Sequence, residues 1–387
     1  MKKISLIIKT ALVAFSTMVL ISCAGPSEPA EILKFYVGSS GANLSHSIYL
    51  CELDAVKGEF VKVDSFSGAK AGAYLDLSPG QEYLFSVNQE PRNEDPENAS
   101  VTSFTVEPGT LALKPLNSQS SEGTDICHIY CSKKGDYVFV ANYGSGQAAA
   151  LPVKENGEIG PATSVVAGEG SGPDESRQQG PHAHQVMLDP GQHYLLVPDL
   201  GTDRVMIYAF DPVTGLLSPN QAQPFFQLAP GAGPSHLAFH PDGKSLYIVN
   251  ELNSTITACQ YDGVNGILTE VNTINTVEES HQGMKYPAAV RVHPSGDFVY
   301  ASTRGENSCI TTFKINDDRS VDRIQVMEQV PLWPREFNLD PSGRYMLVAG
   351  ERSDDIRLYN IDPQSGMVTA TESMVKLPSP ACIRFVK

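Results

Sequence analysis

The chain has 387 residues, of which 44 are acidic and 28 are basic, so its formal net charge at pH 7 is −16. An acidic surface argues against nucleic acids and anionic membrane surfaces as partners. The length exceeds that of a usual single domain, which points to several domains or to one repeat architecture.

The first 22 residues have the pattern of an export signal. Two lysines precede a short apolar run, and small residues follow it. The segment ends in Leu-Ile-Ser-Cys, which resembles the lipobox of bacterial lipoproteins, so we predict a lipid anchor on Cys23. An ordinary signal peptide with a chance cysteine and an uncleaved anchor are the alternatives. Residues 23–33 are expected to form a tether, and the protein is expected in the cell envelope, on the periplasmic or cell-surface side of a membrane.

A strand–turn–strand pattern recurs along the rest of the chain. In residues 188–197, for example, an apolar strand end is followed by a Pro-Gly turn and a second apolar strand. This pattern is typical of β-hairpins. Its copies lie 54, 57, 51, 53 and 47 residues apart, measured at a turn position that is occupied by Pro79, Lys133, Pro190, Pro241, Pro294 and Pro341.

Further strands follow the hairpins, so each repeat is predicted to form a four-stranded sheet, the blade of a β-propeller. The ends of the chain are complementary, because residues 34–41 match the second strand of a hairpin and residues 379–387 match the first. We therefore predict one all-β domain over residues 34–387, a seven-bladed β-propeller. Its ring is closed by the C-terminal strand joining the N-terminal blade, which removes exposed sheet edges. An open β-solenoid is the alternative.

Polar residues gather at two repeat positions. The first, at the start of the inner strand, is six residues before the turn position and holds Ala73, Cys127, His184, Ser235, Ala288 and Arg335. The second, just past the next strand, is ten residues after the turn position and holds Gln89, Tyr143, Leu200, Glu251, Arg304 and Glu351. Because the two strands are antiparallel, both positions meet at one mouth of the central channel, which favours a site for a small polar ligand.

Three alternative roles for these residues stay open. His182 and His184 share one face of a strand and can supply half of a metal site. Alternatively, the histidines bond neighbouring loops, or the arginines at the mouth form salt bridges with the glutamates of other blades. No further ligand stands at a spacing that would complete a metal site with these two histidines. We expect neither a metal nor another cofactor.

The motifs around these positions resemble those of the lactonase family of seven-bladed propellers. That family includes propeller-type 6-phosphogluconolactonases and fungal carboxy-cis,cis-muconate cyclases. The similarity extends from Phe35 to Val386, and its motifs include residues 141–146, 151–153, 180–190, 197–208, 233–256, 299–308 and 334–350.

The resemblance implies functional residues at four positions: His184 or His182, position 235, Glu251 and Arg304. The family has an arginine at position 235, whereas this chain has Ser235. Arg335 holds the matching place in another blade and can partly replace the missing cation.

Lactone hydrolysis is the predicted function. It needs a base that activates water and a cation or donor that stabilises the oxyanion. We assign the base to His184, with Glu251 as its partner or as the base, and the oxyanion or a substrate carboxylate to Arg304 and Arg335. The remaining polar residues are predicted to contact the substrate: His182, Ser235, His236, Gln89 and Tyr143.

The predicted ligand is a sugar lactone or a similar carboxylate-bearing lactone. Because 6-phosphogluconolactone is made in the cytosol, the export signal favours a lactone without phosphate. One alternative is a non-catalytic propeller that binds a carbohydrate or a protein at the cell envelope, since fold alone does not give function. The other is a muconate cyclase-like isomerase, in which the same base acts on a carbon-bound proton.

Overall fold

The computed structural model describes residues 31–41, 44–89, 99–278, 280–281 and 283–387. The predicted export signal and Cys23 lie outside these residues. The described residues form strands β1 to β29 and contain no helix. This part of the chain therefore contains no candidate for a membrane-spanning helix.

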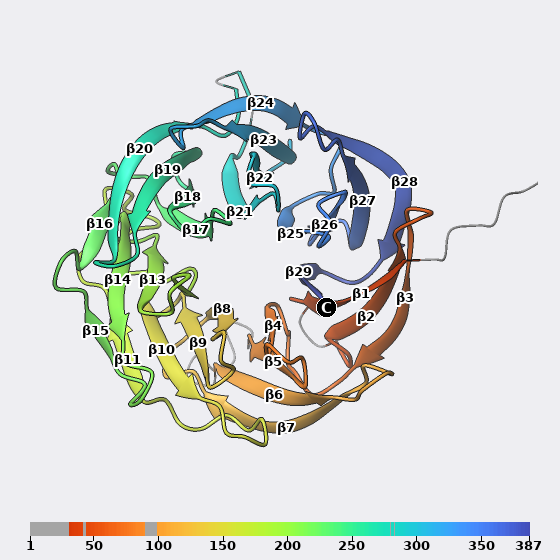
Figure 1. The fold of residues 1–387 in the computed structure, drawn as a ribbon, viewed down its shortest axis with the longest axis horizontal. Coiled ribbons are helices and arrows are strands. Elements are labelled where there is room, and N and C mark those ends of the chain that lie inside the picture. Colours follow the sequence, from red (N-terminus) through yellow and green to blue (C-terminus); the bar gives the residue numbers. More distant parts are fainter. Residues whose placement is uncertain (1–30, 42–43, 90–98, 279, 282) are drawn as a thin grey trace, which may run out of the picture.

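The strands form seven sheets that stand like blades around a common axis (Figure 1). This confirms the predicted seven-bladed, all-β propeller. The first strand of each blade lies nearest the axis, and the chain meanders outward through antiparallel neighbours.

Three blades form the first half of the ring. Their strands are β4 (Leu75–Leu77), β5 (Tyr83–Asn88), β6 (Ser100–Val106) and β7 (Leu113–Ser120) in blade 1; β8 (Ile126–Cys131), β9 (Tyr137–Asn142), β10 (Gln147–Pro152) and β11 (Ser164–Ala167) in blade 2; and β12 (Met187–Leu188), β13 (Tyr194–Asp199), β14 (Arg204–Phe210), β15 (Leu217–Pro219) and β16 (Phe225–Gln227) in blade 3.

Four blades complete the ring. Their strands are β17 (Pro234–Phe239), β18 (Ser245–Asn250), β19 (Thr255–Asp262) and β20 (Ile267–Asn275) in blade 4; β21 (Tyr286–Val292), β22 (Phe298–Arg304), β23 (Cys309–Ile315) and β24 (Val321–Met327) in blade 5; β25 (Pro334–Leu339), β26 (Tyr345–Gly350), β27 (Asp355–Ile361) and β28 (Val368–Lys376) in blade 6; and β29 (Pro380–Phe385), β1 (Ile32–Ser39), β2 (Ile48–Asp54) and β3 (Glu59–Phe66) in blade 7.

Blade 7 joins the two ends of the chain. β29 pairs antiparallel with β1, with Tyr36 opposite Arg384 and Gly38 opposite Cys382. This confirms the predicted ring closure. β1 begins at Ile32, inside the predicted tether, because its first residues already pair with β2.

Blade 3 departs from the four-stranded pattern. Its outer strand is divided into β15 and β16, which both pair with β14, and its inner strand β12 has only two residues. Before β12, the chain contacts β13 through an isolated bridge between Ala183 and Asp199 and through a few single hydrogen bonds, such as that from the His184 amide to the Pro198 carbonyl. Pro198 has no amide hydrogen and therefore limits the ladder at this point. The segment that carries His182 and His184 thus approaches the channel as a loop.

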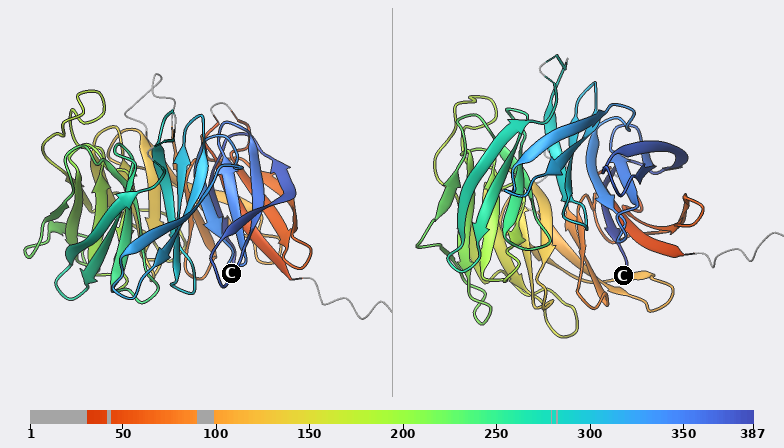
Figure 2. Two further views of the ribbon diagram at one scale, coloured as in Figure 1. Left: turned by 90° about the horizontal axis from the view of Figure 1, so that it is seen from above. Right: turned by 45° about the horizontal axis from the view of Figure 1, so that its top comes forward.

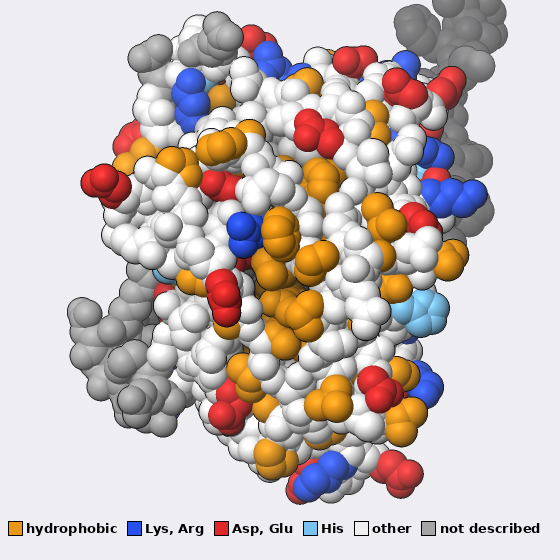
Figure 3. All heavy atoms as spheres, turned by 90° about the vertical axis from the view of Figure 1, so that its left-hand side faces the viewer, with side chains coloured by type: hydrophobic (Ala, Val, Ile, Leu, Met, Phe, Trp, Pro, Cys, Tyr) orange, Lys and Arg blue, Asp and Glu red, His pale blue; other side chains and the backbone are white. Residues whose placement is uncertain are grey.

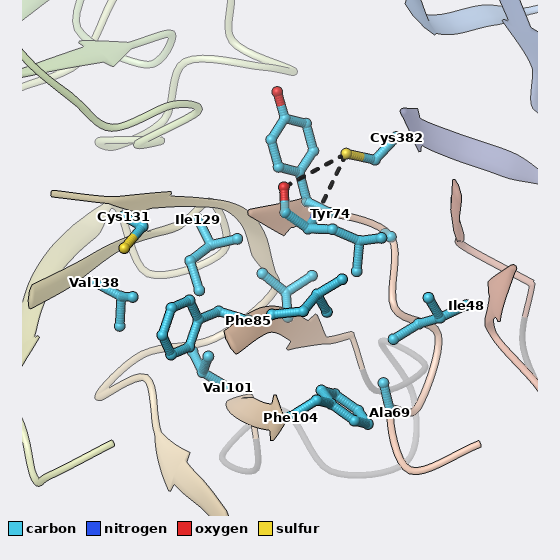
Figure 4. Packing of buried hydrophobic residues seen from close by; sticks show 14 of the residues in the cluster. Ile48, Ala69, Tyr74, Phe85, Val101, Phe104, Ile129, Cys131, Val138 and Cys382 are labelled. Atoms are coloured by element: carbon cyan, nitrogen blue, oxygen red, sulfur yellow. Dashed lines mark hydrogen bonds between the residues drawn. The ribbon is translucent and has the colours of Figure 1, made fainter. Parts of the chain in front are cut away.

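Apolar side chains fill the space between adjacent blades. In Figure 4, Phe85 and Val101 of blade 1 lie against Ile129 and Val138 of blade 2, and all four are fully buried. At the ring closure, the Cys382 thiol accepts a hydrogen bond from a β4 backbone amide at 3.4 Å. The closure is therefore packed as well as paired.

The two faces and the outer wall of the ring differ in what they present. Seen edge-on, the ring has strand-connecting loops on both faces (Figure 2). The outer wall around β15 and β16 mixes acidic, basic and apolar side chains without a patch of one charge (Figure 3). A concentration of charged side chains from several blades is found instead at the mouth of the channel.

Candidate functional site

A pocket of about 280 Å³ lies at the mouth where the inner strands begin. This volume falls just below the roughly 300–1,000 Å³ of sites for drug-sized ligands, so the pocket suits a molecule of the size of one sugar ring. All seven blades or the loops before them contribute to the lining, which consists of Ser40, Ala73, Tyr74, Gln89, Asp125, Cys127, Tyr143, Arg177, His184, Glu251, Arg304, Arg335, Glu351 and Ala381.

A repeated irregularity at the start of the inner strand helps to form this lining. In blade 6 the pairing of β25 with β26 skips Arg335. The same skip occurs at Cys127 in blade 2 and at Ser235 in blade 4. A bulge re-aims the side chain of the extra residue. One repeat position therefore sends side chains toward the mouth in more than one blade.

Glu251, just past β18, is held by two arginines. Arg304 Nη2 lies 2.6 Å from Glu251 Oε2, and Arg177 Nη2 lies 2.8 Å from Oε1. The glutamate is buried. Burial raises the pKa of this carboxyl group, but Arg304, His184 and Arg177 together outweigh it and lower the pKa to about 2. Glu251 is therefore ionised at neutral pH, with both oxygens engaged.

His184 lies beside this ion-paired group. Its Nε2 is 3.6 Å from Glu251 Oε2, and its ring meets those of Tyr143 and His236 edge to face, with centroids 5.5 and 5.3 Å away. Burial and then the charge of Arg335 lower the pKa of His184 to about 3, although Glu251 opposes them. His184 is thus neutral at pH 7 and only a weak proton acceptor.

Arg335 and Glu351 come from the hairpin of blade 6. Glu351 accepts a hydrogen bond from Ser40 Oγ at 2.5 Å. Burial lowers the pKa of Arg335, but nearby carboxylates, with Glu351 first, raise it overall. Within the described part of the chain, neither side chain forms a salt bridge. This side of the pocket therefore offers a cation and a carboxylate that are not clamped to each other.

Comparison with known proteins agrees with this architecture. A family model described as "Lactonase, 7-bladed beta-propeller" matches residues 34–385. The chain belongs to this lactonase family. Among curated relatives, a 6-phosphogluconolactonase of Bacillus subtilis is 29% identical over 354 residues, which cover 91% of this chain and 97% of the relative.

Solved structures extend the similarity to three dimensions. A putative 6-phosphogluconolactonase of Bacteroides fragilis has a TM-score of 0.86 and 29% identity, and the match covers 94% of this chain and all of that one. A periplasmic gluconolactonase of Pseudomonas aeruginosa has a TM-score of 0.85 and 29% identity, with 92% and 99% of the two chains covered. At this identity, the lactonase family is clear, and the choice of substrate depends on the pocket itself.

Six of the predicted site residues lie in the pocket lining of this lactonase-family propeller: His184, Glu251, Arg304, Arg335, Gln89 and Tyr143. Gln89 Nε2 donates to Asp125 Oδ1 at 2.9 Å, and Arg177 Nη2 donates to the Tyr143 hydroxyl at 3.1 Å. Arg304 and Glu251 also form a salt bridge between blades, one of the alternatives that the sequence left open. Several of these side chains are thus bonded to one another and at the same time exposed to the pocket.

The other three predicted substrate contacts are not among the lining residues. His182 stacks on Tyr143, with ring centroids 4.5 Å apart, and its Nδ1 bonds the Tyr143 carbonyl at 2.8 Å. Ser235 is fully buried, and its hydroxyl donates to the Val249 carbonyl at 3.4 Å. His236 is buried against the other histidine rings of the channel. These side chains support the wall of the pocket.

The two histidines that suggested half of a metal site have different surroundings. His182 bonds the backbone of Tyr143, whereas His184 lies beside Glu251. Among the described residues, no three His, Cys, Asp or Glu side chains are grouped as ligands for a metal ion. The alternative of structural histidines describes His182 well.

Arg177 is a lining residue that the repeat pattern did not predict. It lies in the loop between β11 and β12. Asp174 Oδ1 accepts hydrogen bonds from the amides of Ser176 and Arg177, at 2.9 and 3.1 Å, and fixes the turn from which Arg177 reaches Glu251. Asp-x-Ser is a recognisable turn signal. Its sequence does not reveal that the loop bends over the mouth.

Proposed function

We propose that this protein hydrolyses lactones at the channel mouth. The observation that carries the proposal is Arg335, a pocket arginine without a salt bridge in the described part of the chain. A guanidinium free of a carboxylate can donate hydrogen bonds to the lactone carbonyl and stabilise the oxyanion that forms when water attacks. Membership of the lactonase family supports this choice of reaction.

The other polar groups have supporting roles in this proposal. Glu251 keeps Arg304 and Arg177 at the mouth, because both of its oxygens are ion-paired. His184, neutral at pH 7, can hydrogen-bond a substrate hydroxyl. Gln89 and Tyr143 line the same pocket and add further hydrogen-bonding groups for a polyol.

The charge of the pocket favours an uncharged sugar lactone. The described lining contains three arginines and three carboxylates: Arg177, Arg304, Arg335, Asp125, Glu251 and Glu351. A phosphate-bearing substrate is best held by an excess of positive charge. Three arginines and three carboxylates give these lining residues no such excess. The similar protein from Pseudomonas aeruginosa is a periplasmic gluconolactonase, which fits the same substrate class.

A pH-stat assay tests the function. We expect the wild type to release acid from D-glucono-δ-lactone above the spontaneous rate, and to act faster on this lactone than on its 6-phosphate. Saturable sugar binding without turnover would support a binding propeller instead. Interconversion of muconate and muconolactone without hydrolysis of sugar lactones would support the cyclase-like isomerase.

We also propose that the protein is exported and anchored through Cys23. The Leu-Ile-Ser-Cys sequence supports the anchor. Ser39 pairs with Pro380 next to the mouth, so Ile32, seven residues earlier on β1, is about 23 Å away toward the opposite face. An anchor before Ile32 therefore holds the ring by the face away from the pocket. Mass spectrometry of protein from its native membrane should find a lipid-modified Cys23 at the N-terminus; an intact Met1 would contradict the proposal.

A further inference from the structure

Two glutamates occupy the same repeat position at the mouth but have different partners. Glu251 follows β18 and Glu351 follows β26, and both line the pocket. Both oxygens of Glu251 are ion-paired with arginines. Glu351, in contrast, accepts its one side-chain hydrogen bond among the described residues from Ser40 Oγ, through Oε1. Its Oε2 is therefore available to a ligand or a water molecule.

Glu351 and Arg335 reach the pocket side by side. The Glu351 amide donates to the Trp333 carbonyl at 3.1 Å, which fixes the end of β26 next to the bulge that holds Arg335. The carboxylate of Glu351 is the main group that raises the pKa of Arg335, yet the two form no ion pair within the described residues. A cation and a carboxylate that are close but not joined leave space for a carbonyl group and the water that attacks it.

The other candidate bases are poor proton acceptors. The arginines beside Glu251 lower the pKa of that carboxyl group to about 2. Burial and Arg335 lower the pKa of His184 to about 3. Both groups are unprotonated at pH 7, but efficient general bases have pKa values nearer the working pH. The engaged oxygens of Glu251 add a geometric obstacle.

We propose that Glu351 is the general base of this site and takes a proton from the water that attacks the lactone carbonyl bound by Arg335. This assignment rests on the proposed lactone hydrolase function. As the water oxygen bonds to the carbonyl carbon, its proton passes to Glu351, and Arg335 balances the charge on the oxyanion. The ring C–O bond then breaks, and the proton moves from Glu351 to the departing ring oxygen. The product is the hydroxy acid, and Glu351 is again a carboxylate.

The test uses two variants of the proposed base, Glu351→Gln and Glu351→Ala, and a matched control at the same repeat position, Glu251→Gln. Initial rates are measured by pH-stat with D-glucono-δ-lactone and corrected for spontaneous hydrolysis. We expect both Glu351 variants to lower kcat by about 10²–10⁴-fold, the range for general-base catalysis, with little change in KM. Sodium formate can enter the space left in Glu351→Ala and should restore part of its rate. It should not help Glu351→Gln or Glu251→Gln.

The outcomes separate this assignment from the function on which it rests. If the wild type hydrolyses the lactone and Glu351→Gln keeps most of the rate, the assignment is overturned and the lactonase function stands. If the rate is lost at an unchanged melting temperature and formate restores nothing in Glu351→Ala, Glu351 positions Arg335 instead of receiving a proton, which also overturns it. If the wild type hydrolyses no lactone, the proposed lactone hydrolase function is itself overturned.

Discussion

The blade 4 and blade 6 sides of the mouth are built on the same repeat position, yet they hold their glutamates in different ways. On the blade 4 side, Glu251 is buried and ion-paired with Arg304 and Arg177. On the blade 6 side, Glu351 is only half-buried and is bonded to Ser40. The repeat thus determines which residues reach the mouth, whereas their neighbours determine whether a side chain stabilises the ring or is available to a ligand.

The largest effect is expected from breaking the blade 4 side. Glu251→Gln leaves Arg304 and Arg177 without their anion, and loss of one partner from a buried ion pair costs about 3–5 kcal/mol of unfolding free energy. Glu351→Gln should change that free energy by less than about 1 kcal/mol, because it breaks no ion pair. Urea unfolding of the two variants measures both values. Equal losses would mean that the two glutamates are equivalent supports.

For the arginines, the larger effect is expected on the blade 6 side, and the quantity affected is kcat. Arg335→Gln removes the proposed oxyanion donor and should lower kcat by about 10²–10³-fold. Arg177→Gln removes a cation that already neutralises Glu251, so its kcat should change much less. The assay is lactone turnover at saturating substrate. A larger fall in kcat for Arg177→Gln than for Arg335→Gln would mean that the oxyanion is bound on the blade 4 side.

Acid should weaken the blade 4 side through His184. Its pKa is lowered from 6.5 to about 3, so between these pH values the unfolded chain binds one more proton at this residue than the folded chain does. The contribution of His184 to the unfolding free energy is fully present above pH 6.5. It is lost as the pH falls toward 3, by about 1.4 kcal/mol per pH unit. His184→Gln should lack this part of the acid dependence in urea unfolding across that range. An unchanged slope would contradict a neutral, buried His184.

The smallest effect tests the charge balance of the pocket. Gln89 lies in the lining and donates to Asp125. Gln89→Lys adds one positive charge, which should lower the KM for a 6-phosphorylated lactone by up to about tenfold, or 1.4 kcal/mol. The KM for the uncharged lactone is the internal control and should move little. Equal changes for both substrates would show that charge balance does not select the substrate.

The sequence alone predicts the ring well, because hairpin spacing and complementary chain ends are local features. The pairing of β29 with β1 follows directly from the fragments at residues 34–41 and 379–387. The repeat also predicts that four residues meet at one mouth, because all of them stand at repeat positions, and the pocket lining contains all four: His184, Glu251, Arg304 and Arg335. Periodicity is therefore sufficient to predict which of these residues meet.

Periodicity is insufficient where loops and bulges decide the outcome. Arg177 reaches the mouth from a non-repeating loop whose path depends on the Asp174 turn and on Glu251 as a partner. Ser235 occupies a bulge like Arg335 but is too short to reach the pocket, and its hydroxyl bonds the backbone instead. The distinction between the two glutamates depends on neighbours from other blades, which no single repeat contains.

The role of Glu351 as the general base is best tested by measuring kcat and unfolding free energy on the same preparation of Glu351→Gln. We expect kcat for D-glucono-δ-lactone to fall by at least about 10²-fold while the unfolding free energy stays within about 1 kcal/mol of the wild type. A variant that keeps its turnover and loses its stability would contradict this role, because Glu351 would then support the ring and the chemistry would lie elsewhere.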